Sequence, residues 1–276
     1  MTTSSYLYRG RRGVGGRGPF IYAEYEDGHV ICPGRASALK AFVRQAHGGL
    51  QHKLKNAHSS NSEDALTWSC FDALRYVDQR HRKVALTQVW ELAFGDRAIP
   101  AGVENGEIEI GRVYGTTKEG TEVDVSIEGP GVLVFFEAKL YSSMSQSDYP
   151  RKPHNQIARK LRVGAREAVR RGVDFYFIVL DLAPIDKLRN LNPRAGLAAA
   201  QEAKTSGFGS KWLTAYWFVR YKYGWKGSLT PLRRILADAP AIDGISATQL
   251  GRNMGWLTWA DVFKAVLRAV LANQSR

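Results

Sequence analysis

Residues 121–140 have the sequence TEVDVSIEGPGVLVFFEAKL, in which two apolar runs flank a short turn signal. In the first run Val123, Val125 and Ile127 alternate with polar residues, which is the period-two pattern of a strand with one buried face. Residues 129–131, Gly-Pro-Gly, provide the turn signal, and a run of valine, leucine and phenylalanine follows them. The stretch therefore predicts an antiparallel β-hairpin.

The same alternation predicts the register of this hairpin. Folding the chain at residues 130–131 places Glu137 opposite Asp124 and Lys139 opposite Glu122 on one face, with apolar pairs on the other. A slip by one residue would mix the two faces, so the pattern favours this register or one shifted by two residues. Because Pro-Gly is not a favoured two-residue hairpin turn, a longer or bulged loop is an alternative.

Two facing carboxylates are the most informative feature of this register. Like charges directly opposite each other destabilise a sheet, and a divalent cation between Asp124 and Glu137 would remove the repulsion. Carboxylate oxygens suit Mg²⁺, which keeps several waters and accepts phosphate oxygens of a substrate. Lys139 lies two residues after Glu137 and shares its face of the strand. A surface hairpin with solvated charges is the alternative, because Glu-x-Lys alone is common.

An aspartate, a hairpin and then Glu-Ala-Lys at the end of an apolar strand form a more specific pattern. The residues are Asp124 and residues 137–139. This arrangement resembles the PD-(D/E)xK nuclease superfamily, which has the restriction-endonuclease-like fold, although Val123 stands where that family often has a proline. The resemblance rests on residues 121–140 and extends over about 60–182 through the order of the predicted elements.

The resemblance implies a Mg²⁺ or Mn²⁺ ion held by Asp124, Glu137 and the main-chain carbonyl of Ala138. Such an ion would polarise the scissile phosphate and activate a water molecule. Lys139 would help to generate the nucleophile or would stabilise the transition state. The expected activity is therefore metal-dependent hydrolysis of phosphodiester bonds.

Apolar periodicity predicts further elements on both sides of the hairpin. We expect a helix over residues 60–80 and a strand over 107–116, then a helix over 150–172 and a strand over 174–182 after the hairpin. The order helix, three-strand meander, helix, strand is the core order of the resembled fold. The expected fold is α/β, with a restriction-endonuclease-like core, a mixed central sheet flanked by helices, and extra N-terminal and C-terminal elements.

Two polar residues on the predicted helices are further candidates for the site. The superfamily often takes an acidic metal ligand from a helix before the hairpin, and Glu63 leans toward the buried stripe of the 60–80 helix. Residues 60–63, Ser-Asn-Ser-Glu, also fit a capping box, which is a structural alternative. Gln156 lies in the first turn of the 150–172 helix, where many resembled nucleases place a glutamine near the active site. Ordinary solvation is the alternative for Gln156.

The 150–172 helix is strongly basic, and the whole chain has a formal net charge of +13. Such a charge favours polyanions, of which nucleic acid is the most common. A basic helix usually has a solvated face, but beside a metal site we interpret it as a track for backbone phosphates. DNA is the expected partner, and the sequence does not distinguish DNA from RNA. The expected phosphate contacts are Lys152, Arg159, Lys160, Arg162 and Arg166.

The rest of the composition favours a cytoplasmic protein. Two cysteines, Cys32 and Cys70, do not make a disulfide framework, and no cysteine or histidine spacing indicates a zinc site. We expect no membrane association, since the sequence has no apolar run long enough to span a bilayer and no visible lipidation motif. The N-terminus also lacks the apolar region of a secretory signal.

Three regions are expected along the chain. Residues 1–58 form a basic extension with a helix and a hairpin at Asp27-Gly28, and residues 59–183 form the nuclease-like core. Residues 184–276 are rich in aromatic residues and mostly helical, and we expect them to pack on the core. They include an amphipathic helix over 258–273, whose apolar face packs on the core or forms a dimer contact.

These observations support a DNA nuclease of restriction, repair, recombination or phage defence as the leading hypothesis. Many members of the resembled superfamily act as homodimers so that both strands are cut, but the sequence identifies no dimer surface. One alternative is a nucleic-acid-binding protein of the same fold without catalysis, since the charge alone needs no active site. Another is a scaffold protein whose charge serves solubility.

Overall fold

The chain divides into two compact units, Met1–Tyr76 and Val77–Arg276, in a computed structural model. The division follows residue 76, whereas the sequence predicted a first boundary after residue 58. The structure describes residues 10–12, 19–45, 52–117, 119–140, 146–147, 154–181 and 253–275.

Short elements make up the first unit, and its longest helix supplies buried residues that include Trp68, Phe71 and Leu74. Strands β1 and β2 pair antiparallel. The elements are β1 (Gly10–Arg12), β2 (Phe20–Tyr22), the 3₁₀ helix η2 (Tyr25–Gly28), α1 (Ala36–Val43), α2 (His52–Ala57) and α3 (Glu63–Tyr76).

The hairpin predicted at Asp27-Gly28 is wrong. Tyr25–Gly28 form a 3₁₀ helix, in which the amide of Asp27 bonds to the carbonyl of Glu24 at 3.3 Å. The chain after this helix is not paired as a strand, because the amide of Val30 donates to Ser69 Oγ at 2.9 Å. A side chain of α3 therefore satisfies a backbone group that a hairpin would have paired.

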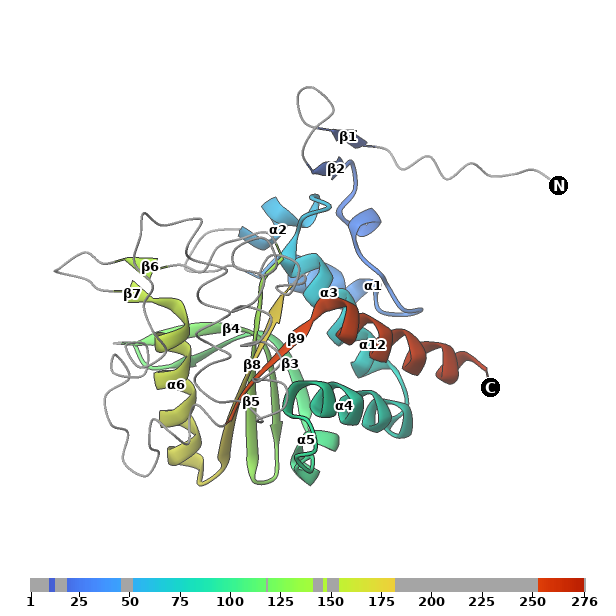
Figure 1. Cartoon of the computed structure of the whole chain (residues 1–276). Helices are drawn as coiled ribbons and strands as arrows, with labels where there is room; N and C mark the ends of the chain where they lie inside the picture. The colour runs from blue at the N-terminus through green and yellow to red at the C-terminus, as the bar shows by residue number, and fades with distance from the viewer. Residues whose placement is uncertain are drawn as a thin grey trace, which may run out of the picture. The chain divides into compact units, whose positions relative to one another are not determined.

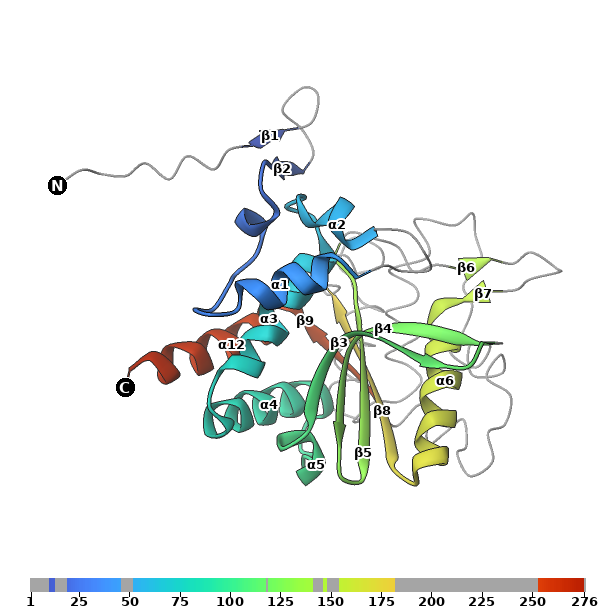
Figure 2. The same cartoon turned by 180° about the vertical axis from the view of Figure 1, so that it is seen from behind.

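The second unit is built on a five-stranded mixed sheet, which confirms the predicted α/β class (Figures 1 and 2). Its first three strands form an antiparallel meander, and the last two run parallel to the third. The strand order is β3 (Glu107–Gly115), β4 (Gly120–Gly129), β5 (Val132–Ala138), β8 (Asp174–Asp181) and β9 (Met254–Thr258). A separate antiparallel pair consists of β6 (Gln146–Ser147) and β7 (His154–Asn155).

The register of the β4–β5 hairpin is as predicted from the sequence. Ser126 lies opposite Phe135 and Gly129 opposite Val132, with a loop of two residues between the strands. Gly131 takes a φ of +72°, a left-handed conformation that glycine adopts without strain. The ladder ends at the pair of Val125 with Phe136.

The prediction of one buried face for β4 is only half right, since Ser126 on the polar face is also fully buried. Its Oγ lies 2.5 Å from the hydroxyl of Tyr114 on β3. Helix α6 (Gln156–Arg171) covers this face of the sheet (Figure 1). The polar alternation of β4 therefore marks residues that face α6 instead of solvent.

Helices cover both faces of the sheet, because neighbouring residues of β8 point to opposite sides. Phe175 faces α6, where Gly164 approaches its ring, whereas Tyr176 contacts Trp90 and Phe94 of α4 (Gln79–Phe94). The helix predicted over 258–273 is present as α12 (Trp259–Gln274), which begins with a capping box of Thr258 and Asp261. The remaining helix of this unit in the described residues is the short α5 (Ala101–Glu104).

The close approach of α6 to the sheet depends on Gly164. A Cβ atom at this position would lie 2.2 Å from Phe175 and 2.9 Å from Phe135. Alanine normally stabilises a helix interior by about 1 kcal/mol relative to glycine. Here we expect Gly164→Ala to destabilise the protein by roughly 1–3 kcal/mol, because overpacking outweighs helix propensity.

Urea unfolding measures this effect, and Val169→Ala on the same helix is the control. Val169 is exposed, so its truncation should change the free energy of unfolding by less than about 0.5 kcal/mol. A Gly164→Ala protein as stable as the wild type would contradict the packing described for α6.

Candidate metal centre

Four charged side chains from three elements meet at the end of the β4–β5 hairpin. Asp124 lies on β4, Glu137 on β5 and Lys139 one residue beyond β5, while Lys160 comes from α6. The strands stop pairing here, and the amide of Ala138 donates to Asp124 Oδ2 at 2.7 Å. The Asp124 carboxylate thus replaces a main-chain partner where the ladder ends.

Glu137 is the centre of this cluster and is fully buried, with 0% of its side chain exposed. Its Oε1 lies 2.6 Å from Nζ of Lys139, and its Oε2 accepts a hydrogen bond from Nζ of Lys160. The same Lys160 ammonium lies 3.5 Å from Oδ2 of Asp124. The two carboxylates therefore converge on one cation, as the predicted register requires.

The main chain of Lys139 is held from two directions. Its amide donates to the carbonyl of Leu180 on β8 at 2.8 Å. Its carbonyl accepts a hydrogen bond of 3.0 Å from the indole of Trp259, the first residue of α12. The sheet and α12 together fix the main chain of Lys139, and this positions its ammonium group beside Glu137.

The charges shift the pKa values of the two acids in opposite directions. Burial opposes ionisation of Glu137, but the ammonium groups of Lys160 and Lys139 outweigh it and lower the pKa of Glu137 to about 2. Burial and the negative charge of Glu137 raise the pKa of Asp124 to about 7, although both lysines act against this shift. The cluster thus holds one firmly ionised carboxylate and one that titrates near neutrality.

The donor set fits a hard divalent cation. Oε1 of Glu137 contacts the Lys139 ammonium and Oε2 contacts the Lys160 ammonium, and a divalent cation could take the place of such a cationic partner. The side chain of Asp124 is 24% exposed, which gives the cluster access to solvent. Two carboxylates with several waters are a common Mg²⁺ environment. No group of three or more histidine, cysteine, aspartate or glutamate side chains in the described part of the chain is arranged to hold a metal.

Lys160 was assigned to a phosphate-contacting face by the sequence, whereas its side chain is only 2% exposed and lies inside the cluster. The helical periodicity of the sequence could have indicated that Lys160 is buried. Lys160 follows Ile157 by three residues and precedes Gly164 by four, and both of these residues are buried. Residues at these spacings share one side of a helix, so Lys160 points toward the sheet.

The other predicted metal ligand, Glu63, is the first residue of α3 and belongs to the first unit. The sequence suggested a capping box over residues 60–63, but the residue that caps α3 is Ser62, whose Oγ accepts from the amide of Ala65 at 3.1 Å. A role for Glu63 in metal binding stays a prediction.

The remaining candidates lie at the start and on the outer side of α6. Gln156 is the first residue of this helix and is half-buried, as is Arg159. Arg162 and Arg166 both form ion pairs with Glu119, each at 2.6 Å. Lys152 falls outside the described residues. Phosphate binding by these side chains and a catalytic role for Gln156 stay predictions.

Comparison of the chain with protein-family models, curated protein sequences and solved structures finds no match. Among the described residues, no helix has both the length and the hydropathy needed to cross a bilayer. The geometry of the cluster is therefore the main guide to function.

Asp124 gives the stability of the metal-free protein a distinctive pH dependence. The pKa of Asp124 is about 7 in the folded protein and ordinarily 3.8, so between these values the folded carboxyl keeps a proton that the unfolded chain has released. The contribution of this group is complete below the lower value and is lost as the pH rises through the higher one. We expect the free energy of unfolding to fall over this range.

Urea unfolding in EDTA at several pH values tests this expectation, with Asp124→Asn as the comparison. Glu137 has the opposite effect only below its ordinary pKa of 4.5, so it adds no slope in the upper part of the range. The Asn variant should lose less stability between about pH 5 and about pH 8 than the wild type. Equal slopes for the two proteins would contradict the raised pKa of Asp124.

Proposed function

We propose that the protein is a metal-dependent nuclease that hydrolyses phosphodiester bonds in DNA and belongs to the PD-(D/E)xK superfamily. The observation that carries the proposal is the convergence of Asp124 and Glu137 on one ammonium group, with Lys139 2.6 Å from Glu137. Adjacent strands bring the two acids together in the predicted register. The order of helix, meander, helix and parallel strand supports the same superfamily.

In this proposal Asp124 and Glu137 hold Mg²⁺ or Mn²⁺, together with the main-chain carbonyl of Ala138. The bound ion supplies Lewis acidity toward a phosphate oxygen and lowers the pKa of water. Asp124 has to lose its proton before it binds a cation, so with a pKa near 7 in the metal-free protein its affinity for the cation should fall below neutral pH. Lys139, fixed by Leu180 and Trp259, directs positive charge toward the reacting phosphate.

Lys160 has a separate role in the metal-free protein, because its ammonium takes the position between the carboxylates that the proposed ion would need. The two lysines neutralise the two acids, so an entering divalent cation has to displace Lys160. Lys160→Gln removes that competing charge and keeps a hydrogen-bond donor. We expect the variant to bind Mg²⁺ at least about 10-fold more tightly, which corresponds to about 1.4 kcal/mol.

Isothermal titration calorimetry without DNA measures this affinity. Lys264→Gln is the matched control, since Lys264 is an exposed lysine of α12. The metal-free Lys160→Gln protein should also unfold more easily than the wild type, because buried carboxylates lose a partner. Mg²⁺ affinity that is unchanged or weaker in Lys160→Gln would refute the competition between lysine and metal.

Cleavage of plasmid DNA with and without Mg²⁺ tests the proposed activity directly. Asp124→Asn, Glu137→Gln and Lys139→Met should each reduce cleavage by about 10²-fold or more, because each removes a charge from the reacting centre. Asp96→Asn, at an exposed aspartate, should cleave as the wild type does. Binding of DNA in EDTA should be largely retained in all four variants. Full cleavage by Asp124→Asn protein would exclude the proposed mechanism.

A second candidate function is nucleic-acid binding without catalysis. It is favoured by the charge balance of the cluster, in which Lys139 and Lys160 already neutralise Asp124 and Glu137. Such a cluster stabilises the hairpin and α6 without any metal. Wild-type protein that binds DNA but shows neither Mg²⁺ binding nor cleavage would establish this function.

The two cysteines bear on the cellular compartment in which the proposed nuclease acts. Cys32 and Cys70 are both free and buried, which supports a reducing, cytoplasmic environment. A homodimer that cuts both strands stays a prediction of the resemblance.

A further inference from the structure

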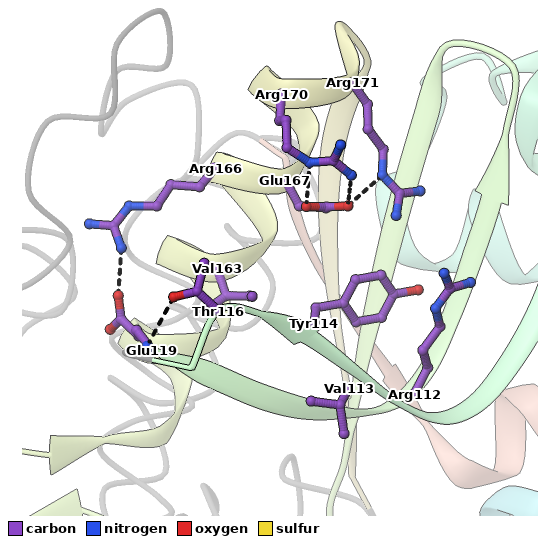
Figure 3. Close-up of a pocket in the computed structure, with 11 residues that line it drawn as sticks. Arg112, Val113, Tyr114, Thr116, Glu119, Val163, Arg166, Glu167, Arg170 and Arg171 are labelled. Carbon is purple, nitrogen blue, oxygen red and sulfur yellow. Dashed lines mark hydrogen bonds and ion pairs between the residues drawn. The ribbon is translucent and has the colours of Figure 1, made fainter.

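A second feature of α6 lies on its outer side, where a pocket of about 410 Å³ opens between this helix and β3 (Figure 3). Its walls come from residues 112–116 and Glu119, at the end of β3 and in the turn after it, and from residues 163–171 of α6. Four arginines line it against two glutamates. Those residues are Arg112, Arg166, Arg170, Arg171, Glu119 and Glu167.

The glutamates hold the guanidinium groups in place. Glu119 Oε2 accepts from Nη1 of Arg166 at 2.6 Å, and Glu167 Oε1 accepts from Nη2 of Arg170 at 2.6 Å (Figure 3). Arg171 Nε also donates to Glu167 Oε1 at 2.6 Å. The side chains of Arg166 and Arg170 are 50% and 69% exposed, whereas those of Glu119 and Glu167 are 25% and 15% exposed. The carboxylates therefore lie deeper than the guanidinium groups that they orient.

The floor of the pocket is a buried aromatic ring. Tyr114 donates a hydrogen bond to Glu128, which also pairs with Arg112 at 2.8 Å and with Arg171. The guanidinium carbons of Arg112 and Arg171 lie 5.3 Å and 6.0 Å from the centre of the Tyr114 ring, within cation–π range. These arginines are thus held before any ligand binds, which reduces the entropy lost on binding.

Guanidinium groups in this arrangement favour phosphate over other anions. The planar fork of arginine matches two phosphate oxygens at once. Of the three guanidinium nitrogens of Arg166, only Nη1 donates a hydrogen bond to another described residue, so several N–H groups of Arg166 remain for a ligand. The pocket also has more positive than negative charge, since four arginines line it and two glutamates do.

The arginines form a row that is longer than one phosphate group. Arg159, Arg162, Arg166 and Arg170 recur at helical spacing, so they lie along one side of α6, which is not the side that carries Lys160 and Gly164. From first to last the row spans roughly 16 Å at 1.5 Å per residue, against about 3.4 Å of axial rise per nucleotide in one DNA strand. A polymer of phosphates fits such a row better than a single nucleotide does.

We infer that the pocket between β3 and α6 binds the sugar–phosphate backbone of a nucleic acid, with Arg166 and Arg170 as its outer phosphate ligands. This assignment rests on the proposed function, because it places the substrate strand along the helix whose inner side carries Lys160. It adds Arg112, Arg170 and Arg171 to the contacts that the sequence indicated.

The test is DNA binding by the double variant Arg166→Ala/Arg170→Ala. In EDTA, fluorescence anisotropy of a labelled oligonucleotide over a series of KCl concentrations gives both affinity and salt dependence. The control is Arg80→Ala/Arg268→Ala, which removes two exposed arginines elsewhere in the same unit. Glu119 and Glu167 keep Arg162 and Arg171 as partners in the pocket variant, so its fold should be retained.

We expect the pocket variant to bind at least about 10-fold more weakly than the control variant at the same salt concentration. Its negative slope of log K against log [salt] should be shallower by about 2, which corresponds to two lost phosphate contacts. Equal affinity and slope in the two double variants would overturn the assignment. The assignment would also be overturned if a mononucleotide displaced the labelled DNA as effectively as an unlabelled oligonucleotide does at the same phosphate concentration.

The outcome is separable from that of the nuclease proposal. Wild-type protein that binds DNA through the pocket but does not cleave it with Mg²⁺ would refute the nuclease and leave the pocket in place. Cleavage by the wild type, together with a pocket variant that binds like the control, would refute the pocket alone.

Discussion

Burial of the Glu137 carboxylate is the constraint on which the second unit depends. A lone ionised carboxylate in a protein interior is very unfavourable, and it persists only when cations and hydrogen-bond donors surround it. Lys139 and Lys160 supply that compensation from the end of β5 and from α6. One buried charge therefore helps to determine two features of the fold. These are the position of α6 on the sheet and the end of the β4–β5 ladder at Asp124.

Helix α6 connects the two proposed sites because its opposite sides face different surroundings. Lys160 points inward and closes the acidic pair, while Arg166 and Arg170 point outward from the same helix. A strand held along the outer side would lie next to the element that carries Lys160. Both proposed events therefore involve side chains of α6: DNA binding involves Arg166 and Arg170, and metal binding displaces Lys160. Gly164 keeps this helix close to the sheet.

Local pattern was enough to predict the hairpin and its register, because a one-residue slip would have mixed the faces of β4 and β5. It also predicted α12 from its apolar stripe. Two parts of this unit depended on distant contacts and were missed: α4, which packs on Tyr176, and β9, which pairs with β8 across 72 residues between Asp181 and Met254. The burial of Lys160 was missed because its charge was weighed more heavily than its place on the buried side of α6.

The central claim is that Asp124 and Glu137 form a metal site from which Lys160 is displaced. A crystal structure of the protein with Mn²⁺, analysed by anomalous diffraction, tests this claim most directly. The account predicts a manganese peak bonded to carboxylate oxygens of both residues, with the Lys160 ammonium moved away from them. Lys160 still bridging the two acids, with no manganese between them at saturating concentration, would contradict it.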